Sequence, residues 1–177
     1  DPKLFNGDFI PWITVNEVTN SKGKYITSTQ TFLTEEGGKR SRLVKSGTLL
    51  FSNSGATLGV PRFTKIDGCI NDGSVAFENI NPKIEPDFLY FFLSTQTVRL
   101  REVQSGYGQP NLNTEIVSNI KITCPSLDEQ KNIIVEIERS TNILEKTINL
   151  LIKKLDLVQE YRQSLISSVV TGKIRIT

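Results

Sequence analysis

Two different hydrophobic patterns divide the chain near Pro125. Before Pro125, short runs of β-branched and aromatic residues alternate with Gly, Asn and Pro turns, which is typical of strands. The runs predict strands at 9–15, 48–51, 60–66, 74–77 and 116–122. Pro86, Asp87 and the apolar residues after them predict one largely buried helix between Pro86 and Val103. We therefore expect a mixed α/β (α+β) globular domain over residues 1–125.

After Pro125 the apolar residues recur every three or four positions, as in the seam of a coiled coil. Ser126 and Glu129 have the spacing of a capping box, and Gly172 provides a stop signal. The seam positions are Ile134, Ile137, Thr141, Leu144, Ile148, Leu151, Leu155, Val158, Arg162, Leu165 and Val169. This pattern predicts one long coiled-coil helix within residues 126–177, spanning about 65 Å at 1.5 Å per residue.

Such a helix cannot bury its seam along its whole length against a domain of about 125 residues. We expect a partner helix, either from another chain or from another part of the same one. Thr141 and Arg162 are polar seam residues of the kind that fixes register or partner choice. For Arg162, the alternative is a guanidinium that reaches solvent past its own apolar stem.

The composition narrows the chemistry further. The chain has 177 residues, of which 37% are hydrophobic and 23% charged, as in proteins that fold. Its longest apolar run, 88–93, is too short to cross a membrane. The absence of His excludes Ser-His and Cys-His nucleophiles and His-containing metal sites. Cys69 and Cys124 cannot form a zinc site alone, so we expect two reduced thiols, in the cytoplasm, and no metal. The start at Asp1 and the lack of Met suggest a piece of a longer protein.

Positive charge is concentrated in residues 22–65, which contain eight Lys and Arg residues and only two Glu residues, a net charge of +6. The whole chain carries only +2, so this segment is typical of a surface that binds a polyanion. A solvated basic loop is an equal alternative on charge alone.

Catalytic patterns are missing. Gly172-Lys173 lacks the remainder of a phosphate-binding P-loop, and Gly106-x-Gly108 lacks the third small residue of a dinucleotide fingerprint. The carboxylates of the first domain lack the paired spacing of acid–base or two-metal sites. The sequence therefore favours a binding protein over an enzyme.

Motifs along the chain carry a resemblance to a known family. The most specific lie at the end of the helix: Tyr161-Arg162, Ser164-Leu165-Ile166 and Val170-Thr171-Gly172-Lys173. Weaker ones precede them, at Trp12-Ile13, in the Ser54-Gly55 to Gly59 loop, at Gln109-Pro110-Asn111, and from Pro125 to Ile134. In this order they resemble the specificity subunits of type I restriction–modification systems. Each such subunit has two target-recognition domains and two conserved helical regions.

The resemblance implies that this chain is one half of such a subunit: a DNA-reading domain followed by one spacer helix. The sequence is then either cut from the C-terminal half or a half-length subunit that acts as a homodimer. Implied partners are double-stranded DNA, the modification (methyltransferase) subunits, the restriction subunit, and a second half or copy, with no membrane. S-adenosylmethionine and ATP are expected only on partner subunits. A spacer of about 65 Å matches roughly two turns of duplex, so we expect a bipartite target with an unread gap.

The expected DNA contacts fall into two groups. Phosphate contacts are expected from the basic residues Lys22, Lys24, Lys39, Arg40, Arg42 and Lys65. Contacts to bases or sugars are expected from Asn53, Ser54, Arg62, Tyr107 and Gln109, which sit in or beside predicted loops. For Asn53, Ser54 and Gln109, turn chemistry is an equal alternative. Arg40 and Arg42 are favoured because Gly37-Gly38 predicts a flexible, exposed loop there.

Three classes of function remain. The first is the DNA-specificity module. The second is a coiled-coil assembly subunit without DNA readout, for which the basic segment is incidental. The third is the recognition part of a fused restriction–methyltransferase enzyme, which requires a methyltransferase domain before Asp1 in a longer chain.

Overall fold

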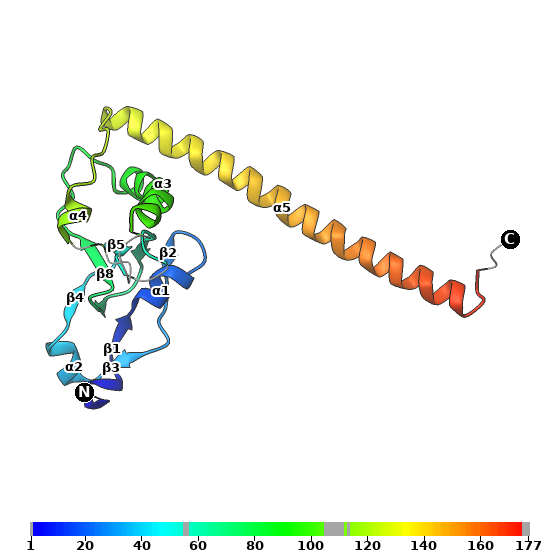
Figure 1. The fold of residues 1–177 in the computed structure, drawn as a ribbon, viewed down its shortest axis with the longest axis horizontal. Coiled ribbons are helices and arrows are strands. Elements are labelled where there is room, and N and C mark those ends of the chain that lie inside the picture. The colour runs from blue at the N-terminus through cyan, green and yellow to red at the C-terminus, as the bar shows by residue number, and fades with distance from the viewer. Residues whose placement is uncertain (1, 55–56, 105–111, 113, 175–177) are drawn as a thin grey trace. The chain divides into compact units, whose positions relative to one another are not determined.

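The computed structural model describes residues 2–54, 57–104, 112 and 114–174. The chain separates into two compact units, 1–131 and 132–177, a few residues beyond the predicted boundary at 125. The first unit holds all described strands and the helices before α5, most of which are labelled in Figure 1. This confirms the predicted fold class, a mixed α/β domain followed by a long helix.

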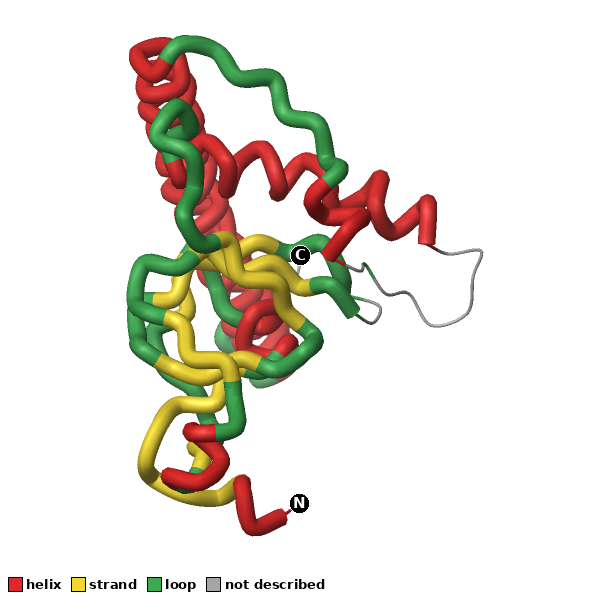
Figure 2. The backbone as a smooth tube through the Cα atoms, turned by 90° about the vertical axis from the view of Figure 1, so that its left-hand side faces the viewer, coloured by secondary structure: helices red, strands yellow, loops and turns green. Residues whose placement is uncertain are grey.

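The described strands form two four-stranded sheets, drawn in yellow in Figure 2. The first has the order β3-β1-β7-β4, with β1 over Phe5–Ile13, β3 over Phe32–Leu33, β4 over Arg42–Val44 and β7 over Gly68–Ile70. The second has the order β2-β6-β5-β8, with β2 over Tyr25–Ile26, β5 over Leu49–Ser52, β6 over Pro61–Thr64 and β8 over Ser74–Phe77. Both sheets are mixed, because β1 pairs with β7 and β2 with β6 in parallel, whereas the other pairs are antiparallel.

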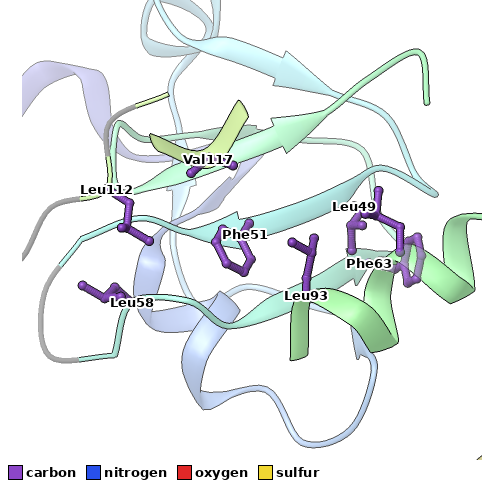
Figure 3. Packing of buried hydrophobic residues seen from close by; sticks show 8 residues of the cluster. Leu49, Phe51, Leu58, Phe63, Leu93, Leu112 and Val117 are labelled. Carbon is purple, nitrogen blue, oxygen red and sulfur yellow. The ribbon is translucent and has the colours of Figure 1, made fainter. Parts of the chain in front are cut away.

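Strand β5 joins the two hydrophobic clusters of the domain. Leu49 and Phe51 point into one cluster, while Leu50, between them in sequence, points into the other, as the two-residue period of a strand requires. In the first cluster, shown in Figure 3, these two residues meet Phe63 of β6 and Leu93 of α3. All residues of β5 are fully buried, which explains its continuous apolar run.

Helix α3 spans Pro86–Gln104 and confirms the helix predicted between Pro86 and Val103. Its buried residues are Leu89 and Leu93, whereas Tyr90 and Phe92 are partly buried and pack against the first cluster. Phe88 and Phe91 are also half-buried, and most residues after Leu93 are exposed, so the helix is less buried than the sequence predicts.

The strand predicted at 116–122 is wrong. Helix α4 spans Thr114–Ser118, and the residues after it form no strand. The amide N–H of Asn119 donates to the carbonyl of Glu115, and Val117 is the buried residue of this turn. One helical turn buries Val117 without a neighbouring strand, whereas a strand here would need a partner for its backbone.

The flexible loop expected around Gly37-Gly38 is also wrong. Helix α1 spans Val15–Asn20, and a second short helix, α2, spans Glu35–Lys39. Gly37 is buried, and a Cβ atom at this position would overlap the carbonyl oxygen of Leu4 in the 3₁₀ turn η1, Pro2–Leu4. The glycine here allows close packing, rather than providing mobility.

The second unit consists mainly of helix α5, which spans Leu127–Val170 as one continuous helix. The hydroxyl of Ser126 accepts a hydrogen bond of 3.3 Å from the amide of Glu129, one half of the predicted capping box. At the other end, Gly172 has φ of 73°, and the amide N–H of Lys173 donates to the carbonyl of Ser168. This left-handed glycine cap ends the helix where the sequence predicts it.

Candidate nucleic-acid interface

The exposed cations predicted to contact phosphate lie mainly on α2 and β4. Lys39 and Arg40 make ion pairs with Glu35 and Glu36 of the same helix, and Arg42 pairs with Glu78 at 3.0 Å. All three cationic side chains remain more than half exposed. Exposed ion pairs of this kind contribute little to stability, so a phosphate group can replace the carboxylate at small cost.

Lys24 has a different environment from the other predicted phosphate contacts. Its ammonium group lies 2.8 Å from the carboxylate of Asp87, and the side chain is only 15% exposed. It also lies 5.2–5.9 Å from the ring centres of Tyr25, Phe63, Tyr90 and Phe91. The domain itself therefore already provides Lys24 with a carboxylate and an aromatic cage.

Lys22, Arg62 and Lys65 are the remaining predicted DNA contacts of the basic segment. Lys22 is exposed and makes no ion pair with any residue that the structure describes. The ammonium group of Lys65 lies 4.2 Å from the ring centre of Tyr25. The guanidinium of Arg62 donates to the carbonyls of Ser21 and Pro61, at 3.2 and 2.7 Å, so it helps to hold β6 against the end of α1.

Asn53 and Ser54 lie just beyond β5, at the end of the second sheet. The backbone of Asn53 donates to the carbonyl of Gly73 and accepts from the amide of Leu112, so these bonds join segments that are distant in sequence and are not local turn bonds. Its side chain is only 8% exposed, and its amide oxygen has no hydrogen-bond partner among the described residues. The buried Ser74 hydroxyl, on the paired strand β8, is also without a partner there. Tyr107 and Gln109, the other predicted reading residues, lie outside the described residues.

A polar hollow that the sequence analysis missed lies beside β1 and α1. Its volume is about 580 Å³, and its lining is rich in amide and hydroxyl side chains. The polar residues lining it include Asn16, Asn20, Ser28, Thr29, Gln30 and Thr31, beside the aromatic rings of Phe5 and Trp12. Amides and hydroxyls both donate and accept hydrogen bonds, as the readout of base edges requires. The available signal was the polar run from Ser28 to Thr31, which by itself indicates only a loop.

Metal or thiol chemistry has little support in the described part of the chain. No group of three or more His, Cys, Asp and Glu residues is placed there to hold a metal ion. Cys69 is buried, which raises the pKa of its thiol, and Cys124 is exposed. Among the described helices, none is both long and apolar enough to cross a membrane.

Comparison with known proteins identifies the family. The model of the type I restriction modification DNA specificity domain matches residues 1–154. The chain belongs to this family. The specificity domain thus covers the whole first unit and more than half of α5.

Two curated relatives come from Methanocaldococcus jannaschii. The specificity subunit of the type I restriction enzyme MjaIX is 29% identical over 163 residues, which are 88% of this chain and 37% of the relative. The specificity subunit of MjaVIII is 26% identical over 164 residues, which are 87% of this chain and 38% of the relative. The chain therefore spans less than two fifths of the length of either relative.

Solved structures show the same fold. A chain from a study of complex assembly and conformational transition in a type I R-M system has a TM-score of 0.76, with 16% identity over 93% of this chain and 39% of its own length. The HsdS subunit from Thermoanaerobacter tengcongensis has a TM-score of 0.62, with 17% identity over 80% of this chain and 32% of its own. Both similarities support the mixed α/β domain followed by a long helix.

Proposed function

We propose that this chain is the non-catalytic, sequence-specific DNA-binding half of a type I specificity subunit. The observation that carries the proposal is the match of the DNA specificity domain over residues 1–154, in a chain about two fifths as long as the specificity subunits it resembles. One domain of this kind reads one half of a bipartite target.

In the proposed complex, Lys22, Lys39, Arg40, Arg42 and Lys65 contact phosphates. These cations are supported by their exposure and by the weakness of their present ion pairs. The amide- and hydroxyl-lined hollow provides the neutral donors and acceptors that base edges require. Phosphate contacts position the protein, and the neutral groups distinguish one sequence from another.

Helix α5 pairs with a second apolar helix, from another copy of this chain or from the other half of a longer subunit. The support is the exposure of the predicted seam, where Leu144, Ile148, Leu151, Leu155 and Val158 are each 54–60% exposed. A continuous aliphatic stripe of this length is covered by a partner in a coiled coil. Paired helices would hold two reading domains about two duplex turns apart.

The remaining partners of this cytoplasmic complex are the modification and restriction subunits. We assign the chemistry to them, together with S-adenosylmethionine and ATP, because the sequence lacks a catalytic pattern. The specificity chain then determines where the methyl group is placed and has no reaction of its own.

The test is selection of DNA from a pool of random duplexes by the chain, alone and co-expressed with its modification subunits. We expect an enriched motif. Arg40→Ala/Arg42→Ala should weaken binding and reduce the slope of log K against log salt by about 0.9 for each phosphate that the variant no longer neutralises. Lys146→Ala/Lys153→Ala on α5 removes the same charge and should leave the slope unchanged.

Failure to enrich any motif would contradict DNA readout and leave the assembly-subunit hypothesis. An unchanged salt slope in the Arg40→Ala/Arg42→Ala variant would show that the phosphate contacts lie on another surface. A catalytic domain encoded before Asp1 would favour the fused-enzyme hypothesis.

A further inference from the structure

A second hollow, of about 470 Å³, lies between α3 and α4, outside the basic segment. Its lining includes Gln96, Arg99 and Leu100 from α3, and Ile116, Ile120 and Lys121 from α4 and the residues after it. None of these residues was among the DNA contacts expected from the sequence. Arg99 and Lys121 lie far apart in the chain, so only the packing of α3 near α4 brings two cations to one hollow.

The two cations of this hollow have no carboxylate partner among the residues that the structure describes. Arg99 and Lys121 are both exposed, and neither makes an ion pair with a described residue. In contrast, the exposed cations Lys39, Arg40 and Arg42 each have a carboxylate partner. Two positive groups that line one hollow without a counter-charge create a local positive potential and favour an anion between them.

The hollow is also lined by aliphatic side chains. Leu100, Ile116 and Ile120 line it together with the two cations and with the side-chain amides of Gln96 and Asn119. Aliphatic side chains contribute no binding energy to a free inorganic anion. A deoxyribose ring, in contrast, presents a weakly polar face that packs against aliphatic carbons. The combination of two cations and three aliphatic side chains in one lining therefore fits a phosphate with its attached sugar.

We propose that this hollow binds one nucleotide unit of the DNA backbone. Arg99 and Lys121 contact its phosphate, and Leu100 and Ile120 pack against its deoxyribose. This inference rests on the proposed function and adds to it a second backbone contact, separate from that of residues 22–65. The hollow is built by the two helices that flank residues 105–113 in sequence, where the reading residues Tyr107 and Gln109 are predicted.

The experiment measures binding of the full chain to a fluorescent random-sequence duplex over a range of salt concentrations. It is made on the chain alone and on its complex with the modification subunits. Arg99→Gln/Lys121→Gln should reduce the slope of log K against log salt by about 2, at roughly 0.9 per released counterion. The control, Lys146→Gln/Lys153→Gln, makes the same charge change on α5, at two positions outside the seam, and should retain the wild-type slope.

A charge-conserving variant separates phosphate contact from a folding defect. Arg99→Lys/Lys121→Arg keeps both charges and should keep the wild-type slope, because the slope counts cations at the DNA rather than their geometry. A third variant, Leu100→Glu, places a negative charge in the lining of the hollow and should weaken DNA binding at every salt concentration.

Several outcomes would overturn the inference. A wild-type slope for Arg99→Gln/Lys121→Gln, or an equal reduction in the α5 control, would show that the hollow makes no phosphate contact. In either case, binding by the wild-type chain would still support the proposed function. If the wild-type chain bound no duplex, alone or with the modification subunits, the proposed function and this inference would both fall.

Discussion

The two units of the chain treat their apolar residues in opposite ways. In the first unit Leu49, Leu50 and Phe51 are 0% exposed, enclosed by strands and by α3. In the second unit Leu144, Leu151 and Leu155 are 57–60% exposed on a single helix. The first unit therefore has a buried core of its own, as an independent domain does. The described part of the second unit has no such core, and its apolar residues form an exposed stripe. The comparison indicates that the stability of α5 depends on a partner helix.

We expect the largest difference in the free energy of unfolding when the same substitution, Leu to Ala, is made in each unit. Leu49→Ala should lower the free energy of unfolding by about 2–5 kcal/mol, because it leaves a cavity in the core. Leu151→Ala should change it by no more than about 0.5 kcal/mol when α5 is unpaired. Urea unfolding measures both, followed by Trp12 fluorescence for the first unit and by far-ultraviolet circular dichroism for α5. If Leu151→Ala were equally costly in a dilute, dissociated chain, its seam would have to be buried within the chain itself.

A substitution at Gln130 tests whether the start of α5 belongs to the buried part of the first unit. It lies in the first turns of α5 but is 0% exposed, and its amide bonds the carbonyls of Lys83 and Pro125 and the amide N–H of Glu85 at 2.8–2.9 Å. Gln130→Ala leaves these groups without partners and should cost about 2–3 kcal/mol. The control is Gln159→Ala, at an exposed position of the same helix, which should be nearly neutral. Similar urea midpoints for both variants would contradict the buried network.

The ion pairs of Lys24 and Lys39 differ in exposure, since Lys24 is largely enclosed whereas Lys39 is on the surface. Lys24→Met removes a charge that is paired with Asp87 and enclosed by aromatic rings, and should cost about 1–2 kcal/mol. Lys39→Met removes an exposed pair on α2 and should cost at most about 0.5 kcal/mol. Thermal unfolding of the two variants measures the difference. An equal and small loss of stability would mean that the Lys24 cage contributes none and that its charge is available to a ligand.

The smallest effect concerns pH. The hydrogen bond from Lys45, followed by that from the amide of Ser46, lowers the pKa of Asp67 from its ordinary value of 3.8. A lowered pKa adds stability above pH 3.8, and this stability is lost as the pH falls through the lower folded value. In Asp67→Asn, the free energy of unfolding should therefore fall less steeply as the pH is lowered through the acid range. Asp156→Asn, an exposed position on α5, should keep the wild-type dependence on pH, and an unchanged dependence in Asp67→Asn would contradict the interaction.

Sequence reasoning predicted the elements whose local pattern is long. The seven-residue repeat of α5 indicated its length, and the apolar runs indicated β5, β8 and α3. It missed β2, β3, β4 and β7, which have two or three residues each and form because neighbouring strands pair with them. The predicted strand at 116–122 failed because a turn of helix and a short strand can share the same few apolar residues.

The candidate site was less predictable than the fold. Charge counting indicated the basic segment, but the partners of its cations are distant in sequence, as in Lys24 with Asp87 and Arg42 with Glu78. The hollow containing Arg99 and Lys121 depends on the packing of α3 near α4, for which the sequence offers no periodic signal. The sequence shows where the cations are. Tertiary contacts are needed to show which of the described cations form ion pairs with carboxylates.

The pairing of α5 is tested most directly by the mass of the chain in solution. Light scattering should give the wild-type chain, measured alone, twice its mass of 19.8 kDa. Leu144→Glu/Leu151→Glu places two charges in the seam and should return the chain to 19.8 kDa, with the folded domain retained by circular dichroism. A wild-type mass of 19.8 kDa would contradict the pairing of α5 between two copies of this chain.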